Sequence, residues 1–142
     1  MKATQTNGRL KVLVVDDDPI ALEAIGELIE SRGFEVHRRD RALGTSSWIL
    51  RERPDIVVTD VNMPGVGGET ILEVTRQRMG DRAPSFILLS SMPEAELAAL
   101  STRCGAVGFL RKGDSDSRTL ARFGEMADEH RQRAAALAEH GL

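Results

Sequence analysis

Short apolar runs alternate with amphipathic stretches of helical length five times along the chain. The runs cover residues 11–15, 35–39, 56–59, 86–89 and 107–110, of which 35–39 is only partly apolar, and a helical pattern follows each of them. Such alternation is typical of βα units, in which a crossover helix connects two parallel strands. The pattern predicts an α/β fold with a doubly wound, five-stranded parallel sheet between two layers of helices.

Local sequence features indicate where some of these elements begin and end. Asp18 is expected to cap the first helix, with Pro19 at its first position and Gly33 closing it. The second strand, residues 35–39, is half polar and is therefore expected at an edge of the sheet. The second helix is expected over residues 43–51.

The last helical stretch is longer than one helix of such a domain needs. It is expected to run from a cap at Ser115 or Ser117 to Ala138, with its first half packed on the sheet. The second half, 128–140, is rich in alanine and charge and is interpreted as a solvated extension. Small or apolar residues at positions 120, 127 and 134 leave a weak two-stranded coil as the alternative, with alanine and His130 in its seam.

Size and composition exclude several classes of protein. With 142 residues the chain has room for one globular domain, and its net charge of −3 gives no reason to expect nucleic-acid binding. No apolar run approaches the ~20 residues that span a bilayer, so neither membrane insertion nor a location outside the cytoplasm is expected. We expect a flexible N-terminus at 1–8, a domain at 9–126 and a helical C-terminal extension at 127–142.

Polar side chains follow four of the five apolar runs, close to where each run ends. They are Asp16 and Asp17 after the first run, Asp60 after the third, Ser90 after the fourth and Lys112 after the fifth. In an open parallel sheet, ligands bind outside the carboxyl ends of the strands. These five side chains are therefore expected to converge on one site.

Three carboxylates in one site repel one another, and a hard divalent cation with oxygen ligands relieves that repulsion. Mg²⁺ is the expected ion. Asp17 and Asp60 would bind it directly, Asp16 directly or through water, and the main-chain carbonyl of Asn62 would add a further oxygen.

A carboxylate beside Mg²⁺ and a lysine ammonium is suited to attack a phosphorus atom. Phosphoryl transfer needs an in-line nucleophile and positive charge on the equatorial oxygens. Asp60 is the expected nucleophile, Lys112 would supply charge, and Ser90 would donate a hydrogen bond. The product, a phosphoaspartate, adds negative charge next to a loop that is free to move.

Four segments together resemble the receiver domain of response regulators in bacterial two-component signalling, of the chemotaxis-regulator type. They are residues 14–19 (VVDDDP), 59–65 (TDVNMPG), 88–91 (LLSS) and 105–112 (GAVGFLRK). The resemblance covers about residues 9–126. It implies a flavodoxin-like (βα)5 fold with strand order 2-1-3-4-5.

The resemblance also implies a role for each matching residue. Asp60 would be the phosphoacceptor, Asp16 and Asp17 the metal-binding pair, Ser90 the hydroxyl switch, Lys112 the phosphate-contacting lysine and Phe109 the aromatic switch. The phosphoryl group would come from a sensor histidine kinase or a phosphotransfer protein. The domain would catalyse only its own phosphorylation and dephosphorylation.

The implied switch has a physical explanation. When the phosphoryl group attracts Ser90, the ring of Phe109 is expected to swing inward beneath the fourth helix. The surface formed by the fourth helix, fifth strand and fifth helix would then change and meet a partner.

The chain departs from the family where proline usually follows the lysine through a cis peptide bond. Here the pair is Lys112-Gly113, and a cis bond before glycine would cost about 2.5–4 kcal/mol. A trans bond is therefore predicted, with Gly113 at positive φ.

Other functions are compatible with the sequence. The domain could act as an unphosphorylated docking module, or as a Mg²⁺-dependent phosphohydrolase with an aspartyl nucleophile, although such hydrolases usually carry Asp-x-Asp after the first strand. The output is either a downstream protein or an output domain outside this chain. A homodimer formed on activation is a further alternative.

Overall fold

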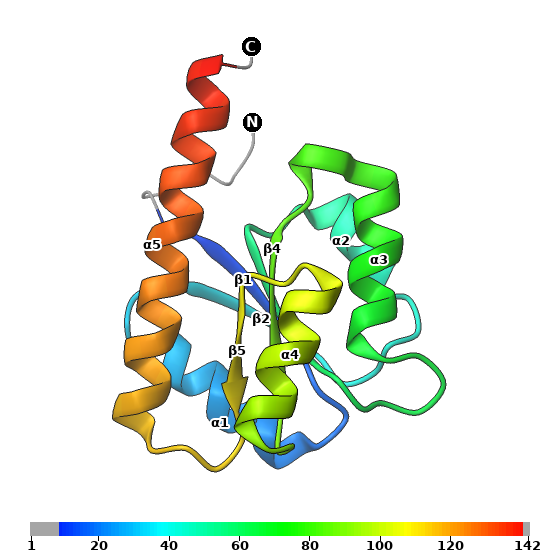
Figure 1. The fold of residues 1–142 in the computed structure, drawn as a ribbon, viewed down its shortest axis with the longest axis vertical. Coiled ribbons are helices and arrows are strands. Elements are labelled where there is room, and N and C mark those ends of the chain that lie inside the picture. Colours follow the sequence, from blue (N-terminus) through cyan, green and yellow to red (C-terminus); the bar gives the residue numbers. More distant parts are fainter. Residues whose placement is uncertain (1–8, 141–142) are drawn as a thin grey trace.

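The computed structural model describes residues 9–140, so the predicted flexible segment 1–8 lies outside the described part of the chain. Strands and helices alternate along the sequence, as Figure 1 shows. In chain order they are β1 (Lys11–Val15), α1 (Pro19–Glu30), β2 (Glu35–Arg39), α2 (Thr45–Glu52), β3 (Ile56–Asp60), α3 (Gly68–Met79), the short 3-10 helix η2 (Gly80–Arg82), β4 (Ser85–Ser90), α4 (Glu94–Cys104), β5 (Gly108–Arg111) and α5 (Asp116–His140).

The five strands form one parallel sheet in the order β2-β1-β3-β4-β5. The inner strands β1, β3 and β4 are buried along their whole length, whereas β2 is half-buried. Strands covered by helices on both faces need continuous apolar sequence, and an edge strand does not. The predicted fold class, the strand order and the edge position of β2 are confirmed.

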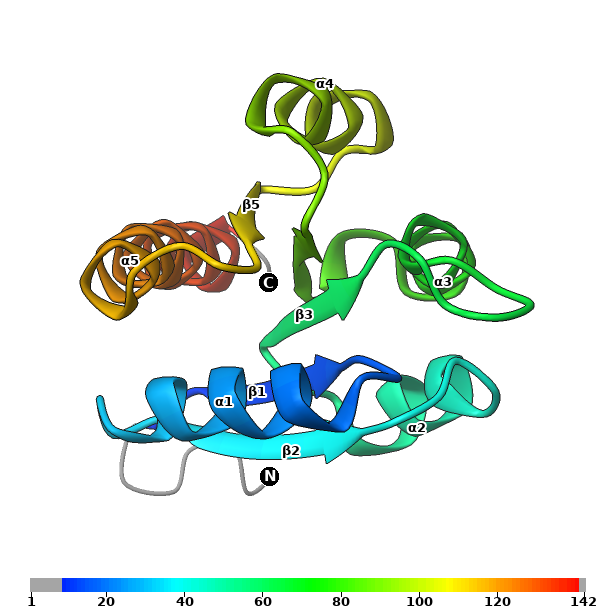
Figure 2. The same cartoon turned by 90° about the horizontal axis from the view of Figure 1, so that it is seen from below.

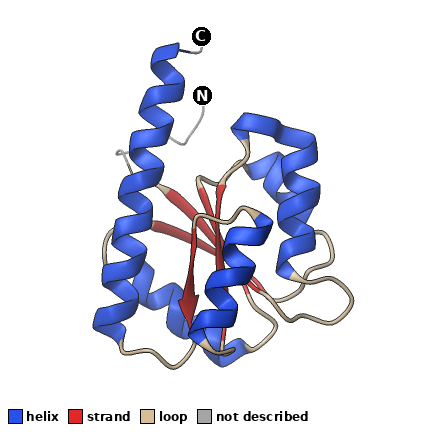
Figure 3. Ribbon diagram, viewed as in Figure 1, coloured by secondary structure: helices blue, strands red, loops and turns tan. Residues whose placement is uncertain are grey.

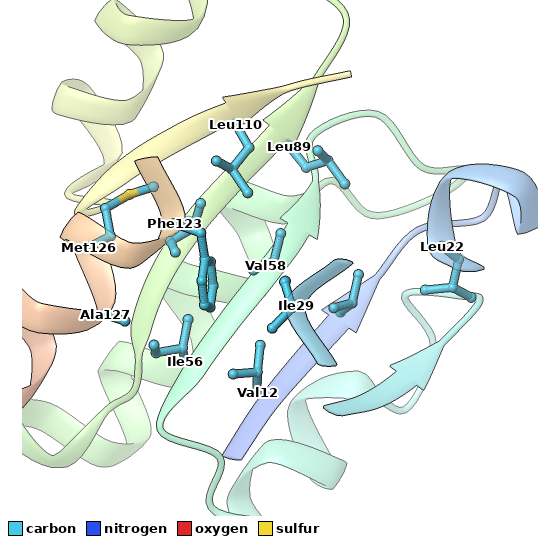
Figure 4. Close-up of a cluster of buried hydrophobic side chains, with 12 residues drawn as sticks. Val12, Leu22, Ile29, Ile56, Val58, Leu89, Leu110, Phe123, Met126 and Ala127 are labelled. Atoms are coloured by element: carbon cyan, nitrogen blue, oxygen red, sulfur yellow. The ribbon is translucent and has the colours of Figure 1, made fainter. Parts of the chain in front are cut away.

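Helices cover both faces of the sheet (Figures 2 and 3). On one face α1 and α5 contact each other, and Ile29 and Phe123 from these helices pack with Val58 of β3 (Figure 4). On the other face α3 has α2 and α4 as neighbours, and Ile71 and Leu97 pack in two further clusters. Each large apolar side chain buried in this way contributes about 1.5–3 kcal/mol. These contacts fix the strand ends that carry the polar residues.

The helix ends agree with the predictions in part. Asp18 caps α1, and its Oδ1 accepts a hydrogen bond from the N–H of Ile20 at 3.0 Å. The helix stops before Gly33, which lies in the turn to β2 with a φ of +91°. α2 begins at Thr45, later than predicted. Gly44 has a φ of +82°, which is not a helical value, so the helix cannot include it or start before it.

Two strands reach one residue further than predicted. β3 includes Asp60 and β4 includes Ser90, because the backbone hydrogen bonds of the sheet continue past both residues. The N–H of Val61 donates to the carbonyl of Leu89 at 3.1 Å, and the N–H of Lys112 donates to the carbonyl of Ser90 at 2.9 Å. β5 is shifted by one residue relative to the predicted range 107–110. The candidate functional side chains therefore start from regular strand ends.

α5 extends beyond the end of the sheet at which the strands begin (Figure 1). It starts after Ser115, whose Oγ accepts a hydrogen bond from the N–H of Arg118 at 3.2 Å, as in one of the two predicted caps. Residues 131–139 are exposed, but His130 is only 9% exposed and its Nδ1 lies 2.7 Å from Oγ of Ser85. Contact with the sheet therefore continues to His130 and to Arg133, whose Nη2 donates to Oγ of Ser85 at 2.8 Å, beyond the predicted start of the solvated segment. Within residues 9–140, no helix has the length and apolar character needed to cross a membrane.

Candidate functional site

Asp16 lies directly after β1, at the edge of the sheet where the strands end, which we call the carboxyl edge. It is fully buried, and its Oδ1 accepts a hydrogen bond from the N–H of Asp18 at 2.9 Å. Its Oδ2 receives no hydrogen bond of good geometry, although the Nζ of Lys112 lies 2.8 Å away. Asp17, the next residue, is exposed. A buried carboxylate oxygen is thus left able to take another positive ligand.

Asp60 ends β3 beside these two carboxylates. It is 4% exposed, and its Oδ1 accepts a hydrogen bond from the N–H of Asn62 at 3.1 Å. Its Oδ2 accepts one from the Nζ of Lys112 at 3.4 Å. One carboxylate oxygen from each of Asp16, Asp17 and Asp60 lies within 4.8 Å of the others. The structure thus brings the three predicted carboxylates and the lysine together from three strand ends.

The site carries more negative than positive charge, and the protonation of Asp60 reflects this. Burial raises the pKa of Asp60 to about 6, and the nearby charge of Asp16 raises it further, while the hydrogen bond from Asn62 and the charge of Lys112 act against the rise. Burial also opposes the charge of Lys112, but its close contact with Asp16 and the attraction of both carboxylates leave its pKa above the ordinary value. A single ammonium group does not neutralise this cluster.

The chemistry of these residues fits a hard divalent cation. Mg²⁺ prefers carboxylate and carbonyl oxygens, and the three carboxylates supply such oxygens at short mutual distances. The Oδ2 of Asp16, which pairs with the Lys112 ammonium without a hydrogen bond of good geometry, is the kind of buried oxygen that a cation would engage. Asn62 is exposed next to Asp60, and the contact it makes with the carboxylate comes from its N–H group.

Ser90 and Phe109 lie on the two strands that follow β3 across the sheet. Asp60 pairs in register with Leu89, so Ser90 follows at the same edge of the neighbouring strand. Ser90 is 2% exposed, and its Oγ accepts a hydrogen bond from the N–H of Met92 at 3.1 Å. Phe109 is also buried, packs with Leu97 of α4, and has the guanidinium of Arg122 4.3 Å above its ring.

Gly113 has the backbone conformation that the sequence predicts. Residues 9–140 contain no cis peptide bond, so the bond after Lys112 is trans, and Gly113 has a φ of +94°. Lys112 nevertheless contacts both Asp16 and Asp60. The absence of proline therefore does not displace the lysine from the carboxylates.

Sequence reasoning missed two residues that shape this site. Gly68 is buried in the first turn of α3, and a side chain there would overlap the carbonyl of Asp60, so only glycine lets the helix approach so closely. Arg111 donates from its Nε to the carbonyl of Met92 at 3.1 Å and so ties β5 to the loop after Ser90. The glycine pair at 67–68 could have suggested the first of these, but no local pattern indicated the second.

Comparison with known proteins identifies relatives of this chain. The chain is 30% identical over 127 residues to the transcriptional regulatory protein FixJ of Azorhizobium caulinodans, covering 87% of this chain and 59% of that protein. It is 29% identical over 106 residues to the C4-dicarboxylate transport transcriptional regulatory protein DctD of Pseudomonas aeruginosa, covering 75% of this chain and 22% of that protein. The chain thus spans only part of these longer relatives.

Solved structures share the fold. The signal receiver domain of a LuxO repressor protein from Vibrio parahaemolyticus superposes with a TM-score of 0.78 at 20% identity, covering 94% of this chain and 99% of that one. The family model for the response regulator receiver domain matches residues 12–123, a span that includes Asp16, Asp60, Ser90 and Lys112. The chain therefore belongs to the response regulator receiver domain family.

Proposed function

We propose that this chain is a signalling domain that accepts a phosphoryl group on Asp60. The observation that best supports the proposal is the position of the Asp60 carboxylate, which lies beside Asp16 and Asp17 and accepts a hydrogen bond from Lys112. Its attack on phosphorus forms an O–P bond and breaks the bond to the donor's leaving group, which for a kinase donor is a histidine nitrogen. Lys112 then exchanges its ion pairs with the two carboxylates for a contact with a phosphoryl oxygen.

Asp16, Asp17, Asp60 and the carbonyl of Asn62 are the groups that would hold Mg²⁺ in this proposal. The bound ion would supply the positive charge that phosphoryl oxygens need and that the lysine alone does not provide. Asp16 would contribute the oxygen left unsatisfied in the structure. Because burial and Asp16 raise the pKa of Asp60, removing the excess negative charge also favours the ionised, nucleophilic form.

The proposed response to phosphorylation begins at Ser90. Its hydroxyl now accepts a hydrogen bond from Met92, and turning toward a phosphoryl oxygen would release that bond and shift the loop before α4. Phe109 packs against Leu97 of this helix, so the change would reach the surface formed by α4, β5 and α5. We propose this surface as the one that meets a partner.

The proposed partners follow from the transfer itself. A sensor histidine kinase or a phosphotransfer protein would donate the phosphoryl group, and either a downstream protein or an output domain outside this chain would receive the signal. The longer relatives named above are transcriptional regulatory proteins, which supports an output domain in those proteins. A role in nucleic-acid binding by this domain is not proposed, and the cytoplasmic location stays a prediction from the sequence.

Incubation with acetyl phosphate and Mg²⁺, followed by intact-mass measurement, tests the proposal. We expect a base-labile phosphoryl adduct on the native protein and none on Asp60→Asn. An unmodified native protein would favour the alternative of an unphosphorylated docking domain. Sustained hydrolysis of small phosphoesters that Asp60→Asn abolishes would instead indicate a phosphohydrolase.

A second experiment addresses self-association. Sedimentation of the protein with and without beryllofluoride and Mg²⁺ compares the activated and resting states. A higher sedimentation coefficient with beryllofluoride would support a homodimer formed on activation, and an unchanged value would support a monomer that acts on a different protein.

A further inference from the structure

A cavity of about 600 Å³ lies at the opposite end of the sheet, between the second half of α5 and the segments that lead into β3 and β4. Pockets for small molecules have volumes of about 300–1,000 Å³ and mostly apolar linings. Met79, Pro84, Ala134 and Leu137 form much of the apolar lining here. The strand from residue 55 to Asp60 separates this cavity from the phosphoacceptor by about 16 Å, at about 3.3 Å per residue.

A buried histidine lines this cavity. His130 is 9% exposed, and its Nδ1 lies 2.7 Å from Oγ of Ser85, which also accepts a hydrogen bond from Nη2 of Arg133 at 2.8 Å. The Ser85 hydroxyl thus joins His130 to Arg133 and holds the imidazole at the wall of the cavity. The Nε2 of His130 lies 3.9 Å from Oδ1 of Asp55, beyond hydrogen-bond distance. This nitrogen is therefore available for a further hydrogen bond.

Three arginines line the same cavity. Arg53, Arg82 and Arg133 form no ion pair with any carboxylate in the described part of the chain. Two aspartates, Asp55 and Asp81, also line it, and Asp55 accepts a hydrogen bond from the backbone N–H of Lys11 at 2.8 Å. The three guanidinium groups exceed the two carboxylates by one charge, so the cavity favours an anionic group.

Arg53 lies beside this cavity as the C-cap of α2. Its φ of +52° is the only positive value of a residue other than glycine between residues 9 and 140. A left-handed residue at this position ends the helix, a role that glycine often has. The end of α2 thus places an arginine, rather than glycine, next to the cavity lining.

We propose that this cavity binds a small amphipathic anion, a molecule with an apolar body and one carboxylate or phosphate group. The apolar body lies against Met79, Pro84 and Leu137. The anionic group accepts hydrogen bonds from the guanidinium groups of Arg53 and Arg82. This function goes beyond phosphoryl acceptance by Asp60 and does not depend on it.

Titration of the isotope-labelled protein with phenyl phosphate, followed by NMR of the backbone amides, tests the proposal. EDTA in the buffer prevents a cation from carrying the phosphate to the carboxylates at the other edge. We expect saturable shifts confined to amides near Arg53, Arg82 and residues 133–138. Phenol, which lacks the anion, and inorganic phosphate, which lacks the apolar body, should each bind at least about tenfold more weakly.

Variants give the second readout. Arg82→Gln and Arg53→Gln should each weaken phenyl phosphate binding about tenfold, the effect of one lost charge-assisted hydrogen bond. Both side chains belong to exposed residues, and unchanged amide shifts in β1 and β4 verify folding. Arg78→Gln is the matched control, since Arg78 is exposed near the end of α3 but does not line the cavity. Shifts centred on Asp60, equal losses in all three variants, or equal affinity for inorganic phosphate would each overturn the proposal.

Discussion

The two ends of the sheet carry opposite charge. Carboxylates crowd the carboxyl edge around Asp16 and Asp60, whereas arginines such as Arg53 and Arg82 line the cavity at the other edge. In a parallel α/β fold the crossover helices begin near the carboxyl edge and end near the other edge. Their dipoles place partial positive charge at the first and partial negative charge at the second. The topology thus favours anionic side chains at one edge and cationic side chains at the other.

The two edges also differ in how their polar groups are paired. At the carboxyl edge Lys112 is shared between two carboxylates, and the carboxyl edge keeps excess negative charge. At the other edge the buried Ser85 hydroxyl forms hydrogen bonds with both His130 and Arg133. The first arrangement is poised to accept a positive ligand, while the second mainly holds α5 against the sheet. The following four predictions test this difference, from the largest expected effect to the smallest.

Replacing Lys112 should cause the largest effect. Lys112→Gln removes the positive charge that contacts both Asp16 and Asp60, so phosphorylation by acetyl phosphate should slow by roughly 10²-fold, as when one electrostatic contact to a transition state is lost. Intact mass followed over time gives the rate. Arg133→Gln makes the same charge change at the other edge and should leave the rate unchanged. Equal rates in both variants would contradict a role for the lysine.

Asp60→Asn should stabilise the metal-free protein at neutral pH. Because the folded-state pKa of Asp60 is about 6 against an ordinary value of 3.8, the folded protein binds more protons than the unfolded chain between these values. Stability is therefore lost as the pH rises through that window. The asparagine variant avoids the loss and should unfold with a free energy about 1–3 kcal/mol higher at pH 7.5.

Urea unfolding in EDTA from pH 5 to pH 7.5 measures this effect. Asp128→Asn, at an exposed position on α5, is the control and should follow the native profile. Added Mg²⁺ should stabilise the native protein and not the Asp60→Asn variant, because binding to the folded state raises its stability. Parallel pH profiles for the native protein and Asp60→Asn would show that burial does not perturb this carboxyl group.

Ser85→Ala should lower stability without affecting phosphorylation. It removes the partner of both His130 and Arg133, and an unsatisfied buried group costs about 1–3 kcal/mol. Thermal or urea unfolding measures the loss, and Ser47→Ala, at an exposed position on α2, should change stability by less than about 0.5 kcal/mol. A slower phosphorylation of Ser85→Ala would show that the two edges are coupled.

The smallest effects on stability are expected from replacing each of two glycines with alanine. Gly113→Ala places a side chain at a φ of +94° and should destabilise the protein by about 1 kcal/mol. Gly124→Ala fills open space within α5 and should stabilise it by about 0.5–1 kcal/mol. Urea unfolding of both variants checks the opposite signs. Stabilisation by both would mean that the backbone at Gly113 relaxes to negative φ.

Local sequence was sufficient to predict the site at the carboxyl edge. Parallel strands end at one edge, so residues that follow apolar runs must meet there. One carboxylate oxygen from each of Asp16, Asp17 and Asp60 lies within 4.8 Å of the others, and Nζ of Lys112 lies 3.4 Å from Oδ2 of Asp60. The trans bond and positive φ at Gly113 were also predictable, because they depend on the chemistry of one residue pair. The chemical roles of these residues stay predictions that the experiments above test.

The other edge could not be predicted in this way. Ser85 and His130 are 45 residues apart and share no motif, so only the path of α5 along the sheet brings them together. The same holds for one contact at the carboxyl edge, between Arg111 and the carbonyl of Met92, which depends on how β4 and β5 end. Such contacts leave no local pattern in the sequence.

The sequence by itself determined the fold class, the strand order through family resemblance, and the set of residues at the carboxyl edge. It could do so because hydrophobic periodicity and strand-end positions are local properties that topology converts directly into proximity. The tertiary structure alone decided how far α5 stays in contact with the sheet, which buried groups pair there, and that a cavity lined by arginines lies beside them. Those features depend on side chains from distant segments packing in three dimensions, which no local pattern encodes.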